Sequence, residues 1–197
     1  MKRIAVFCGS TRGARPDYAN AAVELANVLV SRGISLVYGG GRVGLMGRIA
    51  EAVSDGGGEV IGVIPKFLVD KELAFQRASE LRAVDTMSER KAVMAELSDA
   101  FIALPGGYGT LDELIEMLTW TQLGIHQKPC GLLNTCRYFE ALMAFVDHCV
   151  AEKFVADAHR DMLLIEESAA VLVESLALYE HPVSDKTQWI TDLESSS

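Results

Sequence analysis

A glycine-rich turn in the middle of the chain most tightly limits what this sequence can fold into. Residues 105–110 read Pro-Gly-Gly-Tyr-Gly-Thr and directly follow the apolar run 100–104. Apolar residues recur at helical spacing over 111–123, so we expect a strand, a tight turn and a helix in that order. Such a turn presents backbone N–H groups and the positive helix end to an anion, and its glycines permit close approach. The segment therefore predicts a phosphate site, with the carboxylate of Glu113 one helical turn away.

The same residues also fit a simpler interpretation. Thr110 and Glu113 have the spacing of a capping box, in which each side chain satisfies a backbone N–H group at the start of a helix. A cap needs at most one glycine, whereas Gly106, Gly107 and Gly109 all precede this helix. The surplus of glycines favours a binding site, and the capping box remains open as the alternative.

Apolar runs of strand length alternate with helical patterns along the chain. The expected strands are 3–8, 35–38, 60–64, 81–84, 100–104, 130–133 and 162–165, and the expected helices are 17–31, 45–55, 87–97, 111–123, 138–150 and 168–178. Strands that are apolar throughout and separated by helices are typical of a parallel sheet buried on both faces. We predict an α/β fold: a three-layer, doubly wound, mainly parallel (Rossmann-like) sheet of about seven strands. A single domain is expected over 1–180, with a peripheral tail over 181–197.

Three glycine-rich turns follow expected strands, at residues 8–13, 39–47 and 105–110. Ligands of doubly wound sheets bind at the carboxyl ends of the strands. We therefore expect the three turns to face one crevice, with Ser10 and Gly40 among the residues that bind the ligand.

The second turn also matches Gly-x-Gly-x-x-Gly, a pattern of dinucleotide-binding proteins. Those proteins place the pattern after their first strand and an acidic residue at the end of the next strand. Here a strand and a helix precede the turn, and Glu59 begins its strand instead of ending it. A dinucleotide-dependent oxidoreductase is therefore a weak alternative, and close helix–sheet packing, with Gly47 as the main candidate, would explain the glycines without a ligand.

Two cations, Arg90 and Lys91, fall early in the expected helix 87–97. The helix dipole disfavours positive charge there, so their position indicates an anionic partner. The alternative is a solvated pair that Asp85 and Glu89 balance.

The bulk composition narrows the classes of partner. The 197 residues carry a net charge of −9, so no basic surface is expected to neutralise a nucleic-acid backbone. No apolar run approaches the roughly 18 residues that cross a membrane. The four cysteines lack zinc-site spacing and fit free thiols in a reducing cytoplasm, and Cys8 is expected to be a small buried filler. We expect a cytoplasmic protein with a small-molecule ligand, no metal, and neither nucleic acid nor membrane as a partner.

With these motifs together, residues 3–165 resemble the LONELY GUY family. The likeness rests on 105–113 and 87–92, and extends to 7–10, 38–41, 44–47, 63–65 and 119–124. Members are cytokinin riboside 5′-monophosphate phosphoribohydrolases, and many once bore the label of possible lysine decarboxylases. The resemblance implies hydrolysis of the N-glycosidic bond of a cytokinin nucleotide, of AMP, or of both. No lysine-anchored pyridoxal phosphate site is evident, so no cofactor is expected.

The resemblance also assigns site residues. It implies Glu113 and Arg90 as the catalytic pair, with Glu72, Lys91 and Thr119 in the substrate site. The turn that holds the 5′-phosphate comprises Gly106, Gly107, Tyr108, Gly109 and Thr110, with Gly107, Gly109 and Thr110 offering their N–H groups. Thr119 falls on a different face of the helix from Glu113, so its contact would come from a neighbouring subunit.

One departure and one rival accompany the resemblance. Family members often carry His where this chain has Ser88, which leaves the catalytic pair intact but bears on base preference.

The family forms homodimers, and helix 111–123 has more apolar surface than one buried face requires. Packing of both faces within one subunit is the alternative. A nucleotide or molybdenum-cofactor carrier on the same fold is the rival function, although it would not need Glu113 and Arg90 together.

Overall fold

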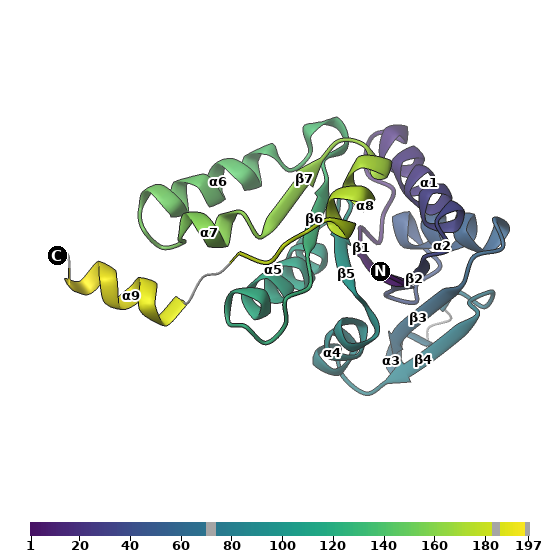
Figure 1. The fold of residues 1–197 in the computed structure, drawn as a ribbon. Coiled ribbons are helices and arrows are strands. Elements are labelled where there is room, and N and C mark those ends of the chain that lie inside the picture. Colours follow the sequence, from purple (N-terminus) through teal and green to yellow (C-terminus); the bar gives the residue numbers. More distant parts are fainter. Residues whose placement is uncertain (70–73, 183–185, 196–197) are drawn as a thin grey trace.

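The computed structural model describes residues 1–69, 74–182 and 186–195. These residues form a seven-stranded sheet with helices on both faces (Figure 1). Every neighbouring pair of strands is parallel, in the order β4-β3-β2-β1-β5-β6-β7. The strands are β1 (Arg3–Phe7), β2 (Ser35–Tyr38), β3 (Val60–Pro65), β4 (Glu80–Val84), β5 (Ala100–Ala103), β6 (Cys130–Leu133) and β7 (Leu163–Glu166). The predicted doubly wound α/β fold is confirmed, and its sheet is parallel throughout.

Helices connect the strands and cover both faces of the sheet. They are α1 (Pro16–Ser31), α2 (Gly44–Asp55), α3 (Lys66–Val69), α4 (Met87–Leu97), α5 (Tyr108–Gln122), α6 (Glu140–Ala151), α7 (Asp157–Arg160), α8 (Ala169–Ala177) and α9 (Lys186–Ser195). The sequence pattern does not predict α3 and α7, because four-residue helices are too short to show an apolar period. Nor does it predict α9, which stands apart from the sheet in Figure 1.

Alternate residues of each strand face opposite layers of the core. In β1, Ile4 and Val6 join the cluster that includes residues of α1, α2 and α8. Ala5 and Phe7 join the cluster that includes residues of α4, α5 and α6. Since both faces of the strand are buried, its sequence is continuously apolar instead of alternating.

The carboxyl ends of β1 and β5 form the topological switch of this sheet, where α1 and α5 leave toward opposite faces. The three glycine-rich turns meet there. Gly9 N–H donates to the Pro105 carbonyl at 3.1 Å, and Leu45 N–H donates to the Gly9 carbonyl at 3.0 Å. The predicted convergence of the turns is therefore confirmed, at the edge where such folds bind ligands.

Glycine is required where the backbone of the second turn packs closely against that of the first. Gly44 has φ +63°, and a Cβ there would lie 2.2 Å from the backbone carbon of Ser10. Close helix–sheet packing, the predicted reason for Gly47, is not the reason that the structure gives. A Cβ at Gly47 would lie 2.2 Å from the Arg42 carbonyl oxygen.

Glu59 precedes β3 and accepts a hydrogen bond from Ser35 Oγ, so it lies at the opposite end of the strands from the turns. That position argues further against a dinucleotide site.

In the part of the chain that the structure describes, no helix combines the length and apolarity needed to cross a membrane.

Within α9, the Trp189 ring packs edge-on against His159 of α7, with 5.9 Å between ring centroids. The division into a domain over 1–180 and a tail over 181–197 stays a prediction.

Candidate active site

The glycine turn before α5 leaves a row of backbone N–H groups without helical partners. Gly107 is the N-cap residue, and no side chain caps the helix. The first N–H group to donate within the helix is that of Leu111, to the Gly107 carbonyl. The four preceding N–H groups therefore belong to the unpaired set at a helix start. A Cβ at Gly107 or Gly109 would meet nothing within 4 Å, so the turn borders open space.

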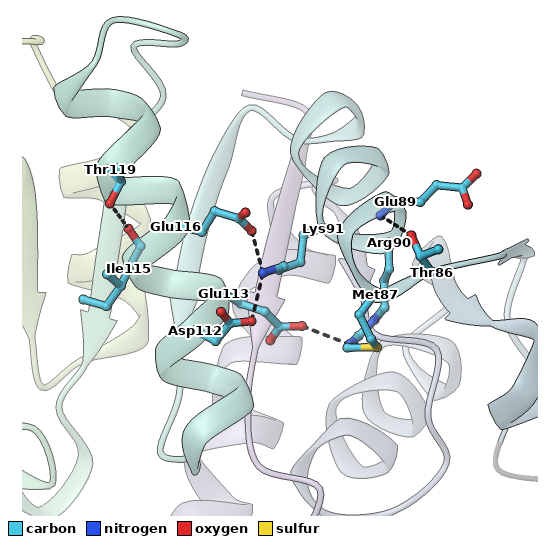
Figure 2. Close-up of polar contacts among 10 residues, drawn as sticks. All are labelled: Thr86, Met87, Glu89, Arg90, Lys91, Asp112, Glu113, Ile115, Glu116 and Thr119. Carbon is cyan, nitrogen blue, oxygen red and sulfur yellow. Dashed lines mark hydrogen bonds and ion pairs between the residues drawn. The ribbon is translucent and has the colours of Figure 1, made fainter.

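The capping-box interpretation of this turn is wrong. Thr110 lies inside α5, three residues after the N-cap, and its side chain is buried against Gly106: a Cβ on Gly106 would lie 2.1 Å from Thr110 Oγ1. Glu113 is also buried, and its carboxylate points to Arg90 instead of back to the helix start (Figure 2). The surplus of glycines is the signal that distinguishes the two interpretations.

A hollow of about 380 Å³ opens in front of this turn. Its lining brings together the predicted Ser10, Gly107, Tyr108, Gly109, Thr110, Glu113 and Arg90 with Cys8, Gly9 and Met46. A second hollow of about 320 Å³ shares Gly9, Ser10 and Gly107 with the first and reaches Gly106 and the ring of Tyr138. Tyr138 Oη donates to the Gly106 carbonyl at 2.6 Å, which anchors the turn between the two hollows.

A buried ion pair lies at one side of the first hollow. Arg90 Nη2 lies 3.1 Å from Glu113 Oε1, and the two side chains are only 10% and 8% exposed. Arg90 Nε donates to the Val63 carbonyl of β3 at 3.1 Å. Glu113 Oε1 accepts no hydrogen bond within the described residues, so the contact with Arg90 is electrostatic and leaves the oxygen able to accept one from a ligand or water.

Burial raises the pKa of Glu113 above the ordinary range of a glutamate, and the positive charge of Arg90 partly opposes that rise. Burial likewise raises the pKa of the Cys8 thiol far above its usual range. Cys8 therefore remains a neutral thiol next to the pair, as expected of a buried filler and unlike a nucleophile.

The start of α4 explains how Arg90 reaches the site. Thr86 caps the helix by accepting the Glu89 N–H at 3.0 Å, and the Glu89 carboxylate accepts the Asp85 N–H at 2.7 Å. Asp85 itself pairs with Lys66. The alternative in which Asp85 and Glu89 balance Arg90 is therefore wrong, because both are engaged at the helix start while Arg90 extends to Glu113.

Lys91 has partners on α5 as well. Its Nζ lies 2.9 Å from Asp112 Oδ2 and 2.9 Å from Glu116 Oε2, on either side of Glu113 in sequence (Figure 2). Burial alone would lower the pKa of Lys91, but the carboxylates of Glu116 and Asp112, each 2.9 Å from its Nζ, leave that pKa raised. Lys91 does not line the hollow. In this structure it holds α4 against α5, and its place in the substrate site stays a prediction.

Lys91→Met is expected to lower the free energy of unfolding by about 1–2 kcal/mol, because two acceptors lose a charged donor that is only 12% exposed. Urea denaturation measures the effect. The matched control is Lys66→Met, since the pair of Lys66 and Asp85 is more than half exposed on both sides and should contribute nothing measurable. Equal curves for wild type and Lys91→Met would contradict the structural role.

Two other predicted residues, Thr119 and Gly40, do not line the hollow. Thr119 donates from Oγ1 to the Ile115 carbonyl, two turns along α5 from Glu113 (Figure 2), and borders a different hollow together with Val146 and His159. Gly40 lines neither hollow, and its carbonyl accepts the Phe75 N–H. Glu72 lies outside the described residues.

Sequence reasoning missed three groups that shape the site: Met46, the Val63 carbonyl and Gly39. Met46 and Gly39 had a local signal, since both belong to the second glycine-rich turn. The Val63 carbonyl had none, because its contact with Arg90 depends on the packing of α4 across β3.

Comparison with known proteins places this geometry in a family. Residues 46–176 match the family model described as possible lysine decarboxylase. The chain is 54% identical to the cytokinin riboside 5′-monophosphate phosphoribohydrolase LOG3 of Arabidopsis thaliana, over 91% of this chain and 83% of that protein. It is 53% identical to the cytokinin riboside 5′-monophosphate phosphoribohydrolase LOG of Oryza sativa subsp. japonica, over 91% of this chain and 74% of that protein.

Solved structures of lower identity share the fold. The molybdenum cofactor binding protein of Rippkaea orientalis superposes with a TM-score of 0.67 at 24% identity, covering 90% of this chain and 97% of that one. The molybdenum cofactor carrier protein of Chlamydomonas reinhardtii gives 0.68 at 19% identity, covering 90% and 99%. These likenesses show the fold alone and lend no support to a carrier function. The family model and the identity of more than half over most of the chain show that this protein belongs to the LONELY GUY (LOG) family.

Proposed function

We propose that this protein hydrolyses the N-glycosidic bond of a nucleoside 5′-monophosphate, either a cytokinin riboside 5′-monophosphate or AMP, and releases the free base and ribose 5-phosphate. The observation that carries the proposal is the Arg90–Glu113 pair beside an unpaired helix start in one hollow. Relatives at 52–54% identity are named as enzymes of this reaction.

The helix start is where the substrate is held. The N–H groups of Gly107, Gly109 and Thr110, with the positive end of the α5 dipole, bind the 5′-phosphate. Ser10 lines the same hollow and offers a hydroxyl group. Fixing the phosphate orients the ribose and applies binding energy at a distance from the reacting carbon.

Glu113 acts where positive charge develops. Breaking a ribosyl bond builds oxocarbenium character on the sugar, which a carboxylate beside the anomeric carbon stabilises; the same carboxylate can deprotonate the attacking water. Arg90 is fixed by the Val63 carbonyl and lies against Glu113. This geometry supports a role for Arg90 in keeping the carboxylate ionised and correctly oriented.

The proposal is tested by comparing substrates that differ in one group. Wild-type protein is incubated with AMP, adenosine and isopentenyladenosine 5′-monophosphate, and the free base is measured by chromatography. We expect base release from at least one nucleotide and a kcat/KM for adenosine lower by about 10²-fold or more, because the phosphate supplies the binding energy. Nucleotide binding without base release would overturn the proposal and favour a carrier.

We also propose that the protein is a homodimer that buries an apolar face of α5 and α6. Leu114 and Met117 of α5 pack in the core, but Ile115 is 44% exposed and Phe145 of α6 is 63% exposed. A hollow of about 150 Å³ between these helices is lined mainly by apolar side chains. An exposed apolar surface of this kind is typical of an interface, and a second copy would bring its Thr119 to the same face.

Sedimentation velocity tests the homodimer. Wild type is expected at twice the 21.4 kDa mass of one chain, and Ile115→Asp at the mass of one. Val171→Asp is the control, since Val171 is 47% exposed on α8, across the sheet from α5. A monomeric wild type, or an Ile115→Asp variant that still dimerises, would contradict this interface.

The four free cysteines support the further proposal that the protein works in a reducing compartment such as the cytoplasm.

A further inference from the structure

Gly39 lies beside the catalytic pair although it lines neither hollow. It follows β2 directly, next to the carboxyl end of β3, and Arg90 reaches over both strand ends from α4. A Cβ at Gly39 would lie 1.9 Å from Arg90 Nη2 and 3.0 Å from its Cζ. Nη2 is also the nitrogen that faces Glu113 Oε1, so any side chain at Gly39 would occupy the position of the catalytic contact.

Arg90 has little room to move while keeping that contact. Its Nε is held by the Val63 carbonyl, and its Nη1 lies 4.0 Å from Met87 Sδ. Met46 Sδ lies 3.2 Å from the same Cβ position at Gly39. A guanidinium enclosed on these sides can avoid a new methyl group only by turning away from Glu113.

The neighbouring glycines have other reasons to be glycine. Gly40 has φ +74°, and its Cβ would meet Ile64 Cβ at 2.7 Å, so a substitution there strains the backbone and the core. At Gly41 a Cβ would meet only the end of the Met46 side chain, at 3.2 Å. Gly39 has no positive φ, and its clash is with the end of a flexible side chain. Its substitution therefore displaces Arg90 without preventing folding.

We propose that Gly39 is a positioning residue for the hydrolysis. Because glycine has no side chain, the space next to its Cα is free for the Arg90 guanidinium, which reaches Glu113 through it. The kinetic consequence of this inference rests on the proposed function. The displacement of Arg90 by a side chain at Gly39 does not.

Gly39→Ala tests the proposal, and Gly41→Ala is the matched control. We expect kcat for base release to fall by about 10- to 100-fold in Gly39→Ala, the loss that a misplacement of about 1 Å can cause, with KM within about threefold of wild type. The acidic limb of the pH profile should move to higher pH, because a separated Arg90 no longer favours the ionised form of Glu113. Gly41→Ala should keep the wild-type kcat and pH profile. A Gly39→Ala variant that matches Gly41→Ala would overturn the proposal.

A second-site variant separates displacement of Arg90 from damage to the fold. Lysine lacks Nη2, the atom that lies 1.9 Å from the Cβ position at Gly39, so Gly39→Ala should cost less than about twofold in kcat when added to Arg90→Lys. A further loss as large as the loss in wild type would show that Gly39 acts independently of Arg90, and so would a Gly39→Ala variant that fails to fold in either background.

Should the wild type release no base, the proposed function fails but the displacement can still be measured. Carbon-13 NMR titration of the Glu113 carboxyl, assigned with Glu113→Gln, should show a higher midpoint pH in Gly39→Ala than in wild type or Gly41→Ala. Unchanged titration in Gly39→Ala would overturn the inference whatever the protein's activity.

Discussion

Glu113→Gln is expected to lower kcat for base release by about 10²–10⁴-fold, the range that a positioned acid–base group contributes. The amide keeps the shape of the side chain but can neither deprotonate water nor oppose the positive charge on the ribosyl ring. The phosphate site is not altered, so KM should change far less than kcat. Steady-state kinetics with AMP or isopentenyladenosine 5′-monophosphate, followed by chromatography, measures both constants.

Glu51→Gln provides the matched control. It makes the same carboxylate-to-amide change on α2, where Glu51 pairs with Arg48 on the surface, and should leave kcat unchanged. A Glu113→Gln variant that retains more than about a tenth of wild-type kcat would contradict a catalytic role for Glu113.

Arg90→Met is expected to lower kcat by about 10²–10³-fold, comparable to the loss of one preorganised electrostatic group. It should also move the acidic limb of kcat/KM to higher pH. Burial already raises the pKa of Glu113, and Arg90 is the main charge that opposes this rise. Without Arg90 the pKa of Glu113 rises further, so the ionised form appears only at higher pH.

The sign of the stability effect follows from the same shift. Because the pKa of Glu113 is higher in the folded than in the unfolded chain, the folded state binds this proton more tightly. The resulting stability is fully present below the unfolded pKa and is lost as pH rises through the folded pKa. The pair therefore serves the reaction at a cost in stability near neutral pH, as is usual for buried catalytic charges.

Arg48→Met, which breaks the surface pair with Glu51, should reproduce neither the kinetic loss nor the shift of the acidic limb. A double variant, Arg90→Met with Glu113→Gln, should be scarcely slower than Glu113→Gln alone, because the two groups act as a unit. Additive losses would show that Arg90 acts on the substrate independently of the carboxylate.

The sequence predicts most of this fold because each buried strand is a continuous apolar run and each long helix shows its own period. Six helices and seven strands lie within a few residues of their predicted positions. The short helices α3 and α7 carry no such signal, and the tail offers too weak a pattern to reveal α9. Local periodicity therefore determines the order of elements, and the crossing rules of parallel sheets supply the rest.

The site is predictable where its signal is local. The turn at 105–110, Glu113 and Arg90 belong to continuous motifs, and the structure brings residues 107–110 of the turn, Glu113 and Arg90 to one hollow. Their partners are not local: Arg90 pairs across 23 positions of sequence with Glu113 and bonds to Val63 on a third element. Nearby charges such as Glu89 were the natural candidates from sequence, but they serve the helix start.

Product analysis of the wild-type protein shows directly which bond of the nucleotide is cleaved. After incubation with AMP and, separately, with isopentenyladenosine 5′-monophosphate, the free base, ribose 5-phosphate, nucleoside and inorganic phosphate are all quantified. We expect base and ribose 5-phosphate in equal amounts from at least one substrate, without nucleoside or inorganic phosphate. Nucleoside and phosphate as products, or intact nucleotide after prolonged incubation with a folded protein that binds it, would contradict cleavage of the N-glycosidic bond.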